Sequence, residues 1–479
     1  MRSSTSSSNA SGGRLLKAWS IALILLVPLC LLVWGFALPC QYHDTFMGEL
    51  KYKVQRLEET PGPRIVLIGG SSAAFSVDSA ALEREFPEYS VVNFGMYAAL
   101  GTTVMLDLAE PRIREGDIVI LLPEQTEQTL SGYFDASVMW QGLDGAFSLI
   151  GDLPRDKRKA LLSTFPAFAG QKLSYSISGS SPVPPGVYAR SSFNEYGDVE
   201  SPLCVRNEMP GGYDENTRIR FDADIISTDF IERINRFTEA AQENGAECWY
   251  ILCPVNRSAV YGEATPEDFY QTLRQSIACP LIGNPNDSVM DPGWFFDTNF
   301  HLNSSGKLLY TRALADGIKA MLGDCSPSEI QIPGMPEPAE IELWEGNDRD
   351  ADCFLYERNS DTWSIVGLTD QGRSRSALII PSTCQSLPVR TIQKGALSGS
   401  MAKEIVIQQN IRSVIDGAFE GCDFLDRIVM EQETPSLCRV GQDLLLGTRA
   451  VVYVPEDSFP AYRSDYFWSI HGQDIQPER

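Results

Sequence analysis

From Arg64 to Met321, runs of consecutive apolar residues alternate with segments whose apolar residues recur at helical spacing. Continuous apolar runs are typical of strands buried on both faces, and a spacing of three and four residues is typical of covering helices. The pattern therefore predicts an α/β unit built on a mostly parallel sheet. Its predicted strands are 64–70, 90–96, 116–124 and 246–255, and its predicted helices include 76–86, 225–245 and 303–321.

A longer apolar run, residues 18–38, contains no charged residue. A helix of about 20 residues spans the ~30 Å hydrocarbon core of a bilayer. The preceding tail, 1–17, is basic and has no acidic residue, so the positive-inside rule predicts a cytoplasmic tail and an extracellular remainder. We therefore expect a single-pass protein of the cell membrane. The membrane span would be followed by a polar stalk at 39–60. The alternative is a cleaved signal peptide, whose apolar core is usually shorter.

The C-terminal part is repetitive. Residues 326–350 are rich in proline and acidic residues and predict a linker. Short apolar strands then recur at a period of 23, at 405–407, 428–430 and 451–453, with an earlier copy at 378–383. Such a period is typical of a leucine-rich repeat solenoid. Residues 351–479 resemble the BspA-like leucine-rich repeats of bacterial surface proteins, as in VIDGAFEGC at 414–422. The resemblance implies a surface for a protein or glycan ligand.

Charge and cysteine content narrow the choice of partners. The formal net charge is −24, which excludes nucleic acid as the main partner because its phosphates would repel the chain. The eleven cysteines include no CxxC pair, and none has a second pair or a histidine at metal-ligand spacing. The sequence therefore predicts no metal site.

A serine–histidine–aspartate combination carries the candidate chemistry. The first predicted strand ends in a Gly-Gly-Ser turn at Ser71, which places a hydroxyl at the carboxyl edge of the sheet, where ligands bind. Serine becomes a nucleophile only when a base takes its proton. Of the three histidines, His43 lies beside the anchor and His471 in the repeats, which leaves His301. Asp297, four residues earlier, can orient that imidazole.

These residues resemble the SGNH (GDSL-like) hydrolase family. IGGS at 68–71 matches the IGDS block of the family, and DTNFHLNSSGK at 297–307 matches its final block. The resemblance implies Ser71 as nucleophile, with Ser72 as the alternative, His301 as base and Asp297 as its orienting partner.

The resemblance spans residues 61–325 and extends to a second block, VVNFGMYAALG at 91–101. It implies an oxyanion hole formed by the N–H groups of Ser71 and Gly95, with Gly101 in reserve. It also implies a three-layer, flavodoxin-like α/β sandwich with a mostly parallel sheet, which here follows one transmembrane helix and precedes a small repeat solenoid.

The third family block departs from the pattern. The family usually places an asparagine in a GxND motif there to donate to the oxyanion, whereas this chain reads PEQTEQ after the strand. Glu124 cannot donate while it is ionised, and loss of such a donor costs ~2.7–4 kcal/mol of transition-state stabilisation. Asn256 and Asn194 are alternative donors, although the sequence favours a plain strand-end turn as the role of each.

The resemblance to anchored SGNH proteins, such as alginate O-acetyltransferases and the proteins that assist D-alanylation of teichoic acids, implies acyl chemistry on a cell-envelope glycan. Ser71 would form an acyl-enzyme, without metal or organic cofactor, and hydrolysis and transfer would use the same residues. The alternative is an inactive surface protein whose repeats mediate adhesion. Two other partners are expected: a protein or glycan ligand of the repeat domain, and the membrane, which the N-terminal helix would contact.

Overall fold

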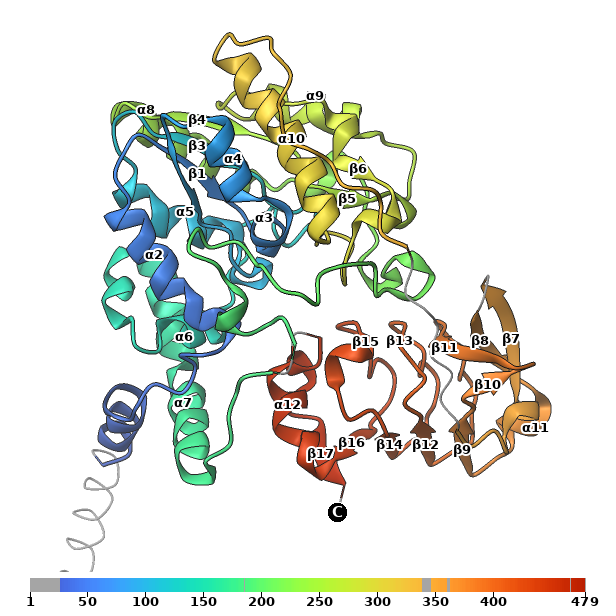
Figure 1. Ribbon diagram of the computed structural model, residues 1–479. Helices are drawn as coiled ribbons and strands as arrows, with labels where there is room; N and C mark the ends of the chain where they lie inside the picture. The colour runs from blue at the N-terminus through green and yellow to red at the C-terminus, as the bar shows by residue number, and fades with distance from the viewer. Residues whose placement is uncertain (1–25, 185, 338–345, 360–361, 466, 479) are drawn as a thin grey trace, which may run out of the picture.

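The computed structural model describes residues 26–184, 186–337, 346–359, 362–465 and 467–478. Two units lie side by side: an α/β unit and a smaller unit of stacked strands (Figure 1). Each has its own apolar core, the first reaching from Tyr42 to Ile330 and the second from Cys353 to Ile475. The fold is therefore mixed α/β with parallel sheets, as the apolar pattern predicts.

The sheet of the α/β unit has the order β2-β1-β3-β4, and every pairing is parallel. Its strands are β1 (Arg64–Ile68), β2 (Ser90–Asn93), β3 (Ile118–Leu121) and β4 (Glu247–Tyr250). All residues of β1 and β3 are buried, so both faces of the sheet are covered. At the start of β1, the buried Arg64 guanidinium donates to Asp117 and to the Arg112 carbonyl, which satisfies its charge in the core.

Two groups of helices cover this sheet. The first contains α3 (Ser71–Ser76), α4 (Ser79–Glu85) and α10 (Ser304–Met321), and the second contains α2 (Leu50–Glu59), α5 (Thr102–Ala109) and α8 (Thr228–Glu243). In Figure 1 the strands lie between α4 and α5. The remaining helices of the unit are α6 (Ala136–Leu143), α7 (Arg155–Ser178) and α9 (Pro266–Ser276), with the short pair β5 (Val255–Asn256) and β6 (Val289–Met290).

The predicted membrane span, 18–38, lies partly outside the described residues, and the tail 1–17 lies wholly outside them. Within the described part, 26–32 are helical and Val33–Ala37 form a π-helical turn. Of the helices in the part of the chain that the structure describes, none is both long and apolar enough to cross a membrane. The π-helical turn packs on α7: the Phe36 and Phe165 rings stack with centroids 5.0 Å apart.

A buried lysine ties this turn to the α/β unit. Lys172 Nζ of α7 donates to the Gly35 carbonyl at 3.0 Å and pairs with Asp144 Oδ1 at 2.7 Å. Both Lys172 and Asp144 are buried. If the turn moved away, this buried ammonium group would lose the Gly35 carbonyl as an acceptor, which favours the observed position of the turn.

Residues 39–60 do not form the polar stalk expected from the sequence. They contain α2, in which Leu50, Val54 and Leu57 are buried in the core of the α/β unit. The spacing of these three apolar residues gives the helix one apolar face. Burial of that face joins the segment to the α/β unit.

The repeats form a parallel solenoid. One sheet has the order β17-β16-β14-β12-β9, and Ile405 pairs with Leu378 of the preceding repeat and Ile428 of the next. Ile428 then pairs with Val452 rather than with Val451, because Val452 faces the core. The strands of this sheet are β9 (Ala377–Ile380), β12 (Glu404–Ile407), β14 (Arg427–Met430), β16 (Val451–Pro455) and β17 (Ile475–Glu478).

A second sheet of the repeat unit has the order β15-β13-β11-β8-β7 and is parallel along this path except for the hairpin that opens it; β10 also pairs with β11 in antiparallel orientation. That hairpin lies at the start of the repeat unit. Its strands are β7 (Phe354–Asn359), β8 (Thr362–Leu368), β11 (Leu387–Ile392), β13 (Ser413–Val414) and β15 (Arg439–Val440), with β10 (Thr383–Cys384) beside β11. The unit ends in α11 (Asp370–Arg373) on one side and α12 (Phe459–Ser464) on the other (Figure 1).

Hydrogen bonds join the two units. Asn216 accepts from the backbone N–H of Asp416 at 3.0 Å, and Gln393 donates to Glu215 at 3.2 Å. Arg439 of β15 is buried and donates to the carbonyl of Asp297 at 2.9 Å. The repeat unit therefore reaches the segment that carries the candidate base.

Candidate active site

The turn after β1 brings Ser71 to the first position of α3. A Cβ on Gly69 would lie 2.6 Å from the Leu122 carbonyl oxygen, and a Cβ on Gly70 would collide with the Glu124 carboxylate. Glycine is required at position 69 because the backbone just after β3 passes so close to the turn, and glycine at position 70 leaves room for the Glu124 carboxylate. The Gly-Gly-Ser sequence is thus explained by close packing, and the turn delivers a serine hydroxyl to the sheet edge.

Ser71, His301 and Asp297 lie together, although the serine and the histidine are 230 residues apart in sequence. The distance from Ser71 Oγ to His301 Nε2 is 2.8 Å, and that from His301 Nδ1 to Asp297 Oδ1 is 2.9 Å. With the proton on Nδ1, His301 donates to the carboxylate and accepts from the serine hydroxyl. Phe75 stacks on the imidazole with centroids 4.0 Å apart and fixes the ring plane.

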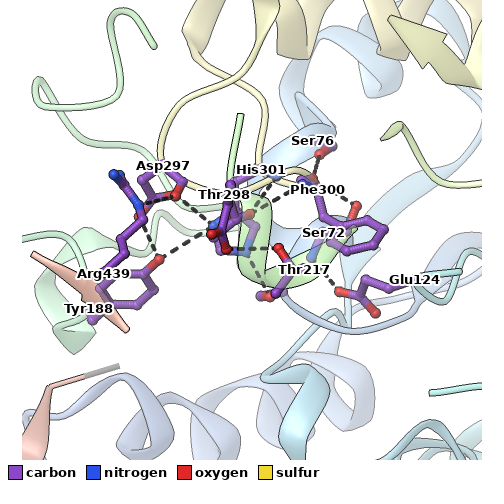
Figure 2. Close-up of polar contacts among 12 residues, drawn as sticks. Ser72, Ser76, Glu124, Tyr188, Thr217, Asp297, Thr298, Phe300, His301 and Arg439 are labelled. Atoms are coloured by element: carbon purple, nitrogen blue, oxygen red, sulfur yellow. Dashed lines mark hydrogen bonds and ion pairs between the residues drawn. The ribbon is translucent and has the colours of Figure 1, made fainter. Parts of the chain in front are cut away.

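The surroundings of Asp297 favour its ionised form. Tyr188 donates to Asp297 Oδ2 at 2.6 Å, and Arg439 donates to the backbone carbonyl (Figure 2). Burial alone would raise the pKa of Asp297, but His301, Arg439 and the Tyr188 hydroxyl together hold that pKa below its usual value. A carboxylate that stays charged is suited to stabilising an imidazolium beside it.

The alternative nucleophile, Ser72, points elsewhere. Its hydroxyl donates to the Phe300 carbonyl at 3.1 Å, and its N–H donates to Glu124 Oε1 at 2.8 Å. In Figure 2, Ser72 and Glu124 lie on the opposite side of His301 from Tyr188 and Arg439. Among the residues described, the hydroxyl that faces the imidazole Nε2 is that of Ser71.

The two glycines expected at the oxyanion hole are engaged in other bonds. The Gly95 N–H donates to Asn93 Oδ1 at 2.9 Å, and the Gly101 N–H donates to the Ala98 carbonyl at 3.0 Å. In this arrangement neither N–H is free to bind an oxyanion. The physical reason is that Asn93, at the end of β2, closes a tight turn with its own side chain.

Glu124 lies beneath the turn that carries the serine. Its carboxyl group is buried, and burial raises its pKa against the opposing effect of the Ser72 N–H. The adjacent Gln125 is also buried: its Oε1 accepts from the Cys253 thiol at 3.2 Å. Its Nε2 has no hydrogen-bond partner within the described part of the chain. A buried amide donor left in this state is costly unless a ligand or water binds it.

Asn256 and Asn194 have structural roles. Asn256 caps a turn by accepting from the Ser258 N–H at 3.0 Å and donates to the Gly212 carbonyl at 2.8 Å. Asn194 accepts from two backbone N–H groups of its own loop, those of Tyr196 and Asp198, and is exposed at its amide end. The turn interpretation of both residues is therefore the one that the structure favours.

Phe75, Gln125, Tyr188 and Arg439 were not predicted from the sequence. Gln125 follows Glu124 directly, so an amide side chain was visible in the third block at the next position. Tyr188 lies in a proline-rich loop and Arg439 in a degenerate repeat, and neither carries a sequence signal. Both reach Asp297 only through tertiary packing.

An aspartate from the repeat unit lies near this cluster. Asp465 is fully buried; its Oδ1 accepts from the N–H groups of Phe467 and Trp468, and its Oδ2 has no partner among the described residues. Burial, opposed by those N–H groups, and then the charge of Asp297, partly offset by Arg439, raise the pKa of Asp465 to about 7.

This pKa gives a test of stability against pH. Because the native state binds the Asp465 proton more tightly than the unfolded chain, stability decreases as pH rises from about 4 to about 7. Above pH 7 the full penalty, about 4 kcal/mol, is present. Asp465→Asn cannot ionise, so urea unfolding should show it to be more stable than the parent at pH 8 and equal at pH 4. If the unfolding free energies of Asp465→Asn and the parent differed by the same amount at pH 4 and at pH 8, the raised pKa of Asp465 would be contradicted.

Comparisons with known proteins give little further identity. No family model matches the chain, and no curated protein matches it. Among solved structures it is similar to a leucine-rich repeat protein of T. pallidum, with 21% identity over 24% of this chain and 45% of that chain, and a TM-score of 0.15. It is also similar to a leucine-rich cell surface protein of Faecalibacterium prausnitzii, with 15% identity over 23% of this chain and 33% of that chain, and a TM-score of 0.17.

The chain spans less than half the length of either neighbour.

Proposed function

We propose that this chain is an SGNH-type serine esterase or O-acyltransferase that acts on acylated glycan of the cell envelope through an acyl-enzyme at Ser71. The observation that carries the proposal is the line of contacts from Ser71 Oγ through His301 to Asp297, with distances of 2.8 and 2.9 Å. This geometry is what an activated serine requires. The finer fold assignment, a three-layer SGNH sandwich, belongs to the same proposal.

The chemistry proceeds in two steps. His301 Nε2 takes the hydroxyl proton as Ser71 Oγ attacks the ester carbonyl, and the tetrahedral intermediate expels the sugar alkoxide, which takes that proton from His301. The acyl group is then bonded to Ser71 Oγ. In the second step His301 deprotonates water or an acceptor hydroxyl, which attacks the acyl carbonyl; the bond from the acyl carbon to Ser71 Oγ then breaks, and Ser71 Oγ takes the proton from His301. Water gives hydrolysis and a sugar hydroxyl gives transfer.

We assign the oxyanion hole to the Ser71 N–H, at the first position of α3, and to Gln125 Nε2. The buried and unpartnered state of this amide supports its role, because an oxyanion would supply the missing acceptor. Gln125 then takes the place that the family gives to asparagine.

Truncation of that donor should be measurable. Gln125→Ala is expected to lower kcat for p-nitrophenyl acetate by about 10²–10³-fold, with little change in KM, since the bond forms mainly in the transition state. Gln125→Asn, which keeps an amide, should retain more activity than Gln125→Ala. Equal rates for the parent and Gln125→Ala would show that the oxyanion is bound elsewhere.

We place the α/β and repeat units outside the cell, held by the N-terminal apolar segment 18–38. The basic tail and the uncharged run support this placement. The direct test of the activity is turnover of p-nitrophenyl acetate, together with labelling by a serine-reactive phosphonate. Absence of both in the folded chain would remove the proposal.

A second candidate is an inactive surface protein whose repeats bind a protein or glycan. It is favoured by one observation: Ser71 and His301 are only 2% and 1% exposed, so a substrate has little direct access to them. Ligand binding by the chain without ester turnover or phosphonate labelling would support this second function.

A further inference from the structure

A cleft of about 380 Å³ lies where the repeat unit meets the α/β unit. One wall is formed by residues 42–47, α6 and α7, and the other by α12, Asp465 and residues 469–473. We infer that this cleft is a binding site for a segment of a neutral glycan, and that the repeat unit forms one of its walls. The inference names the ligand of the proposed enzyme, and it rests on the proposed function for the acyl chemistry that the bound segment would undergo at Ser71.

The cleft adjoins the triad through Tyr188. This tyrosine lines the cleft, and its hydroxyl lies 2.6 Å from Asp297 Oδ2 and 3.4 Å from His301 Nδ1. Tyr97 also lines the cleft and follows the turn at Gly95 by two residues. A ligand held here is therefore separated from the Asp297–His301 pair by one aromatic ring.

The chemistry of the walls selects the ligand class. Among the described residues, four tyrosines, three glutamines and three serines line the cleft, including Tyr42, Tyr175, Gln141, Gln171 and Gln473. Tyrosines offer an apolar ring with a polar tip, and planar amides offer paired donors and acceptors. Sugars present the matching surfaces, because each ring has an apolar C–H face and a rim of hydroxyl groups.

Charge argues for a neutral polymer. The charged residues among the described lining are Asp135, Asp465 and Arg463, two carboxylates against one guanidinium. A phosphate or uronate chain needs an excess of cations, and the net charge of −24 adds long-range repulsion. An acyl chain needs a continuous apolar wall, which the polar side chains interrupt.

The carboxyl group of Asp465, which is buried beside the cleft, has one oxygen without a hydrogen-bond partner among the described residues. Asp465 lines the cleft and is 0% exposed, and its Oδ2 has no partner in the described part of the chain. A sugar hydroxyl can donate to an ionised carboxylate or accept from a protonated one, so it satisfies Oδ2 in either state. Asp465 comes from the repeat unit, so the repeats take part in ligand binding at this site.

The test measures oligosaccharide binding by the full-length chain with isothermal titration calorimetry. The probes are cellotetraose, xylotetraose and chitotetraose, with tetragalacturonate as the anionic comparison. We expect at least one neutral probe to bind, and Arg463→Ala and Gln141→Ala, one on each wall, to weaken that binding by about tenfold or more. Arg449→Ala, an exposed position of the repeat unit outside the cleft, is the matched control and should bind as the parent does.

The outcomes separate this inference from the proposed function. If no neutral probe binds, if both wall variants bind as the parent does, or if tetragalacturonate binds more tightly than every neutral probe, the glycan site is wrong. Phosphonate labelling of Ser71 is scored on the same preparation. Labelling without oligosaccharide binding removes the glycan site and leaves the activity; binding without labelling leaves the glycan site and removes the activity.

Discussion

Ser71→Ala should abolish labelling by a serine-reactive phosphonate and lower kcat for p-nitrophenyl acetate by about 10⁴–10⁶-fold. The reason is that the Ser71 hydroxyl is the one that faces His301 Nε2, at 2.8 Å, and alanine removes the atom that would be acylated. The fold should tolerate the change, because Ser71 opens α3 and alanine is a good helix former. Intact-mass spectrometry of the probe-treated protein gives the stoichiometry directly.

The matched control is Ser72→Ala, one residue along the same helix. Its hydroxyl donates to the Phe300 carbonyl, and its bond to Glu124 comes from the backbone and survives the substitution. We expect Ser72→Ala to be labelled at full stoichiometry. Labelling that persists in Ser71→Ala and disappears in Ser72→Ala would transfer the nucleophile to Ser72 and contradict the geometry described above.

The second large effect is expected for Asp297→Asn, which should lower kcat by about 10⁴-fold with KM nearly unchanged. An asparagine amide donates to His301 Nδ1, where the carboxylate accepted from it at 2.9 Å, and so moves the ring proton to Nε2. In that tautomer the ring cannot accept from Ser71. Because Asp297 has its pKa held below the usual value, the loss should be similar from about pH 5 to 8.

A variant that keeps the Asp297 carboxylate separates the effect of the His301 tautomer from a general loss of packing at the site. Tyr188→Phe removes the hydroxyl that donates to Asp297 Oδ2 at 2.6 Å and keeps the ring. We expect it to lower kcat by about tenfold at most. If Tyr188→Phe and Asp297→Asn were equally inactive, the tautomer argument would be wrong and the site would depend on the whole hydrogen-bonded cluster instead.

Much of the arrangement follows from local patterns in the sequence. The apolar runs that predict strands coincide with β1, β3 and β4, because strands buried on both faces have no polar positions to obscure them. The repeat period likewise predicts the stacking of β9, β12 and β14. Ser71, Asp297 and His301 were found because each lies in a short block with its own local pattern.

The remaining features depend on contacts that no local pattern reports. The Gly95 N–H was assigned to an oxyanion, yet the Asn93 side chain two residues earlier binds it. Tyr188 and Arg439 reach Asp297 from a loop and from the second unit, at separations of 109 and 142 residues. The segment 39–60 was interpreted from its polar composition, although its apolar face packs into the core.

Two contacts limit how far the α/β unit can move relative to the N-terminal segment. They are the bond from Lys172 to the Gly35 carbonyl and the stacking of Phe36 on Phe165. A domain joined to an anchor by a flexible linker samples all positions within the length of that linker. Here Gly35 and Phe36 belong to the apolar segment 18–38 itself and are held against α7, so the end of that segment is fixed to the α/β unit. Under the proposed anchoring, the α/β unit would keep a fixed height and orientation above the membrane, and a polymer substrate would have to reach it there.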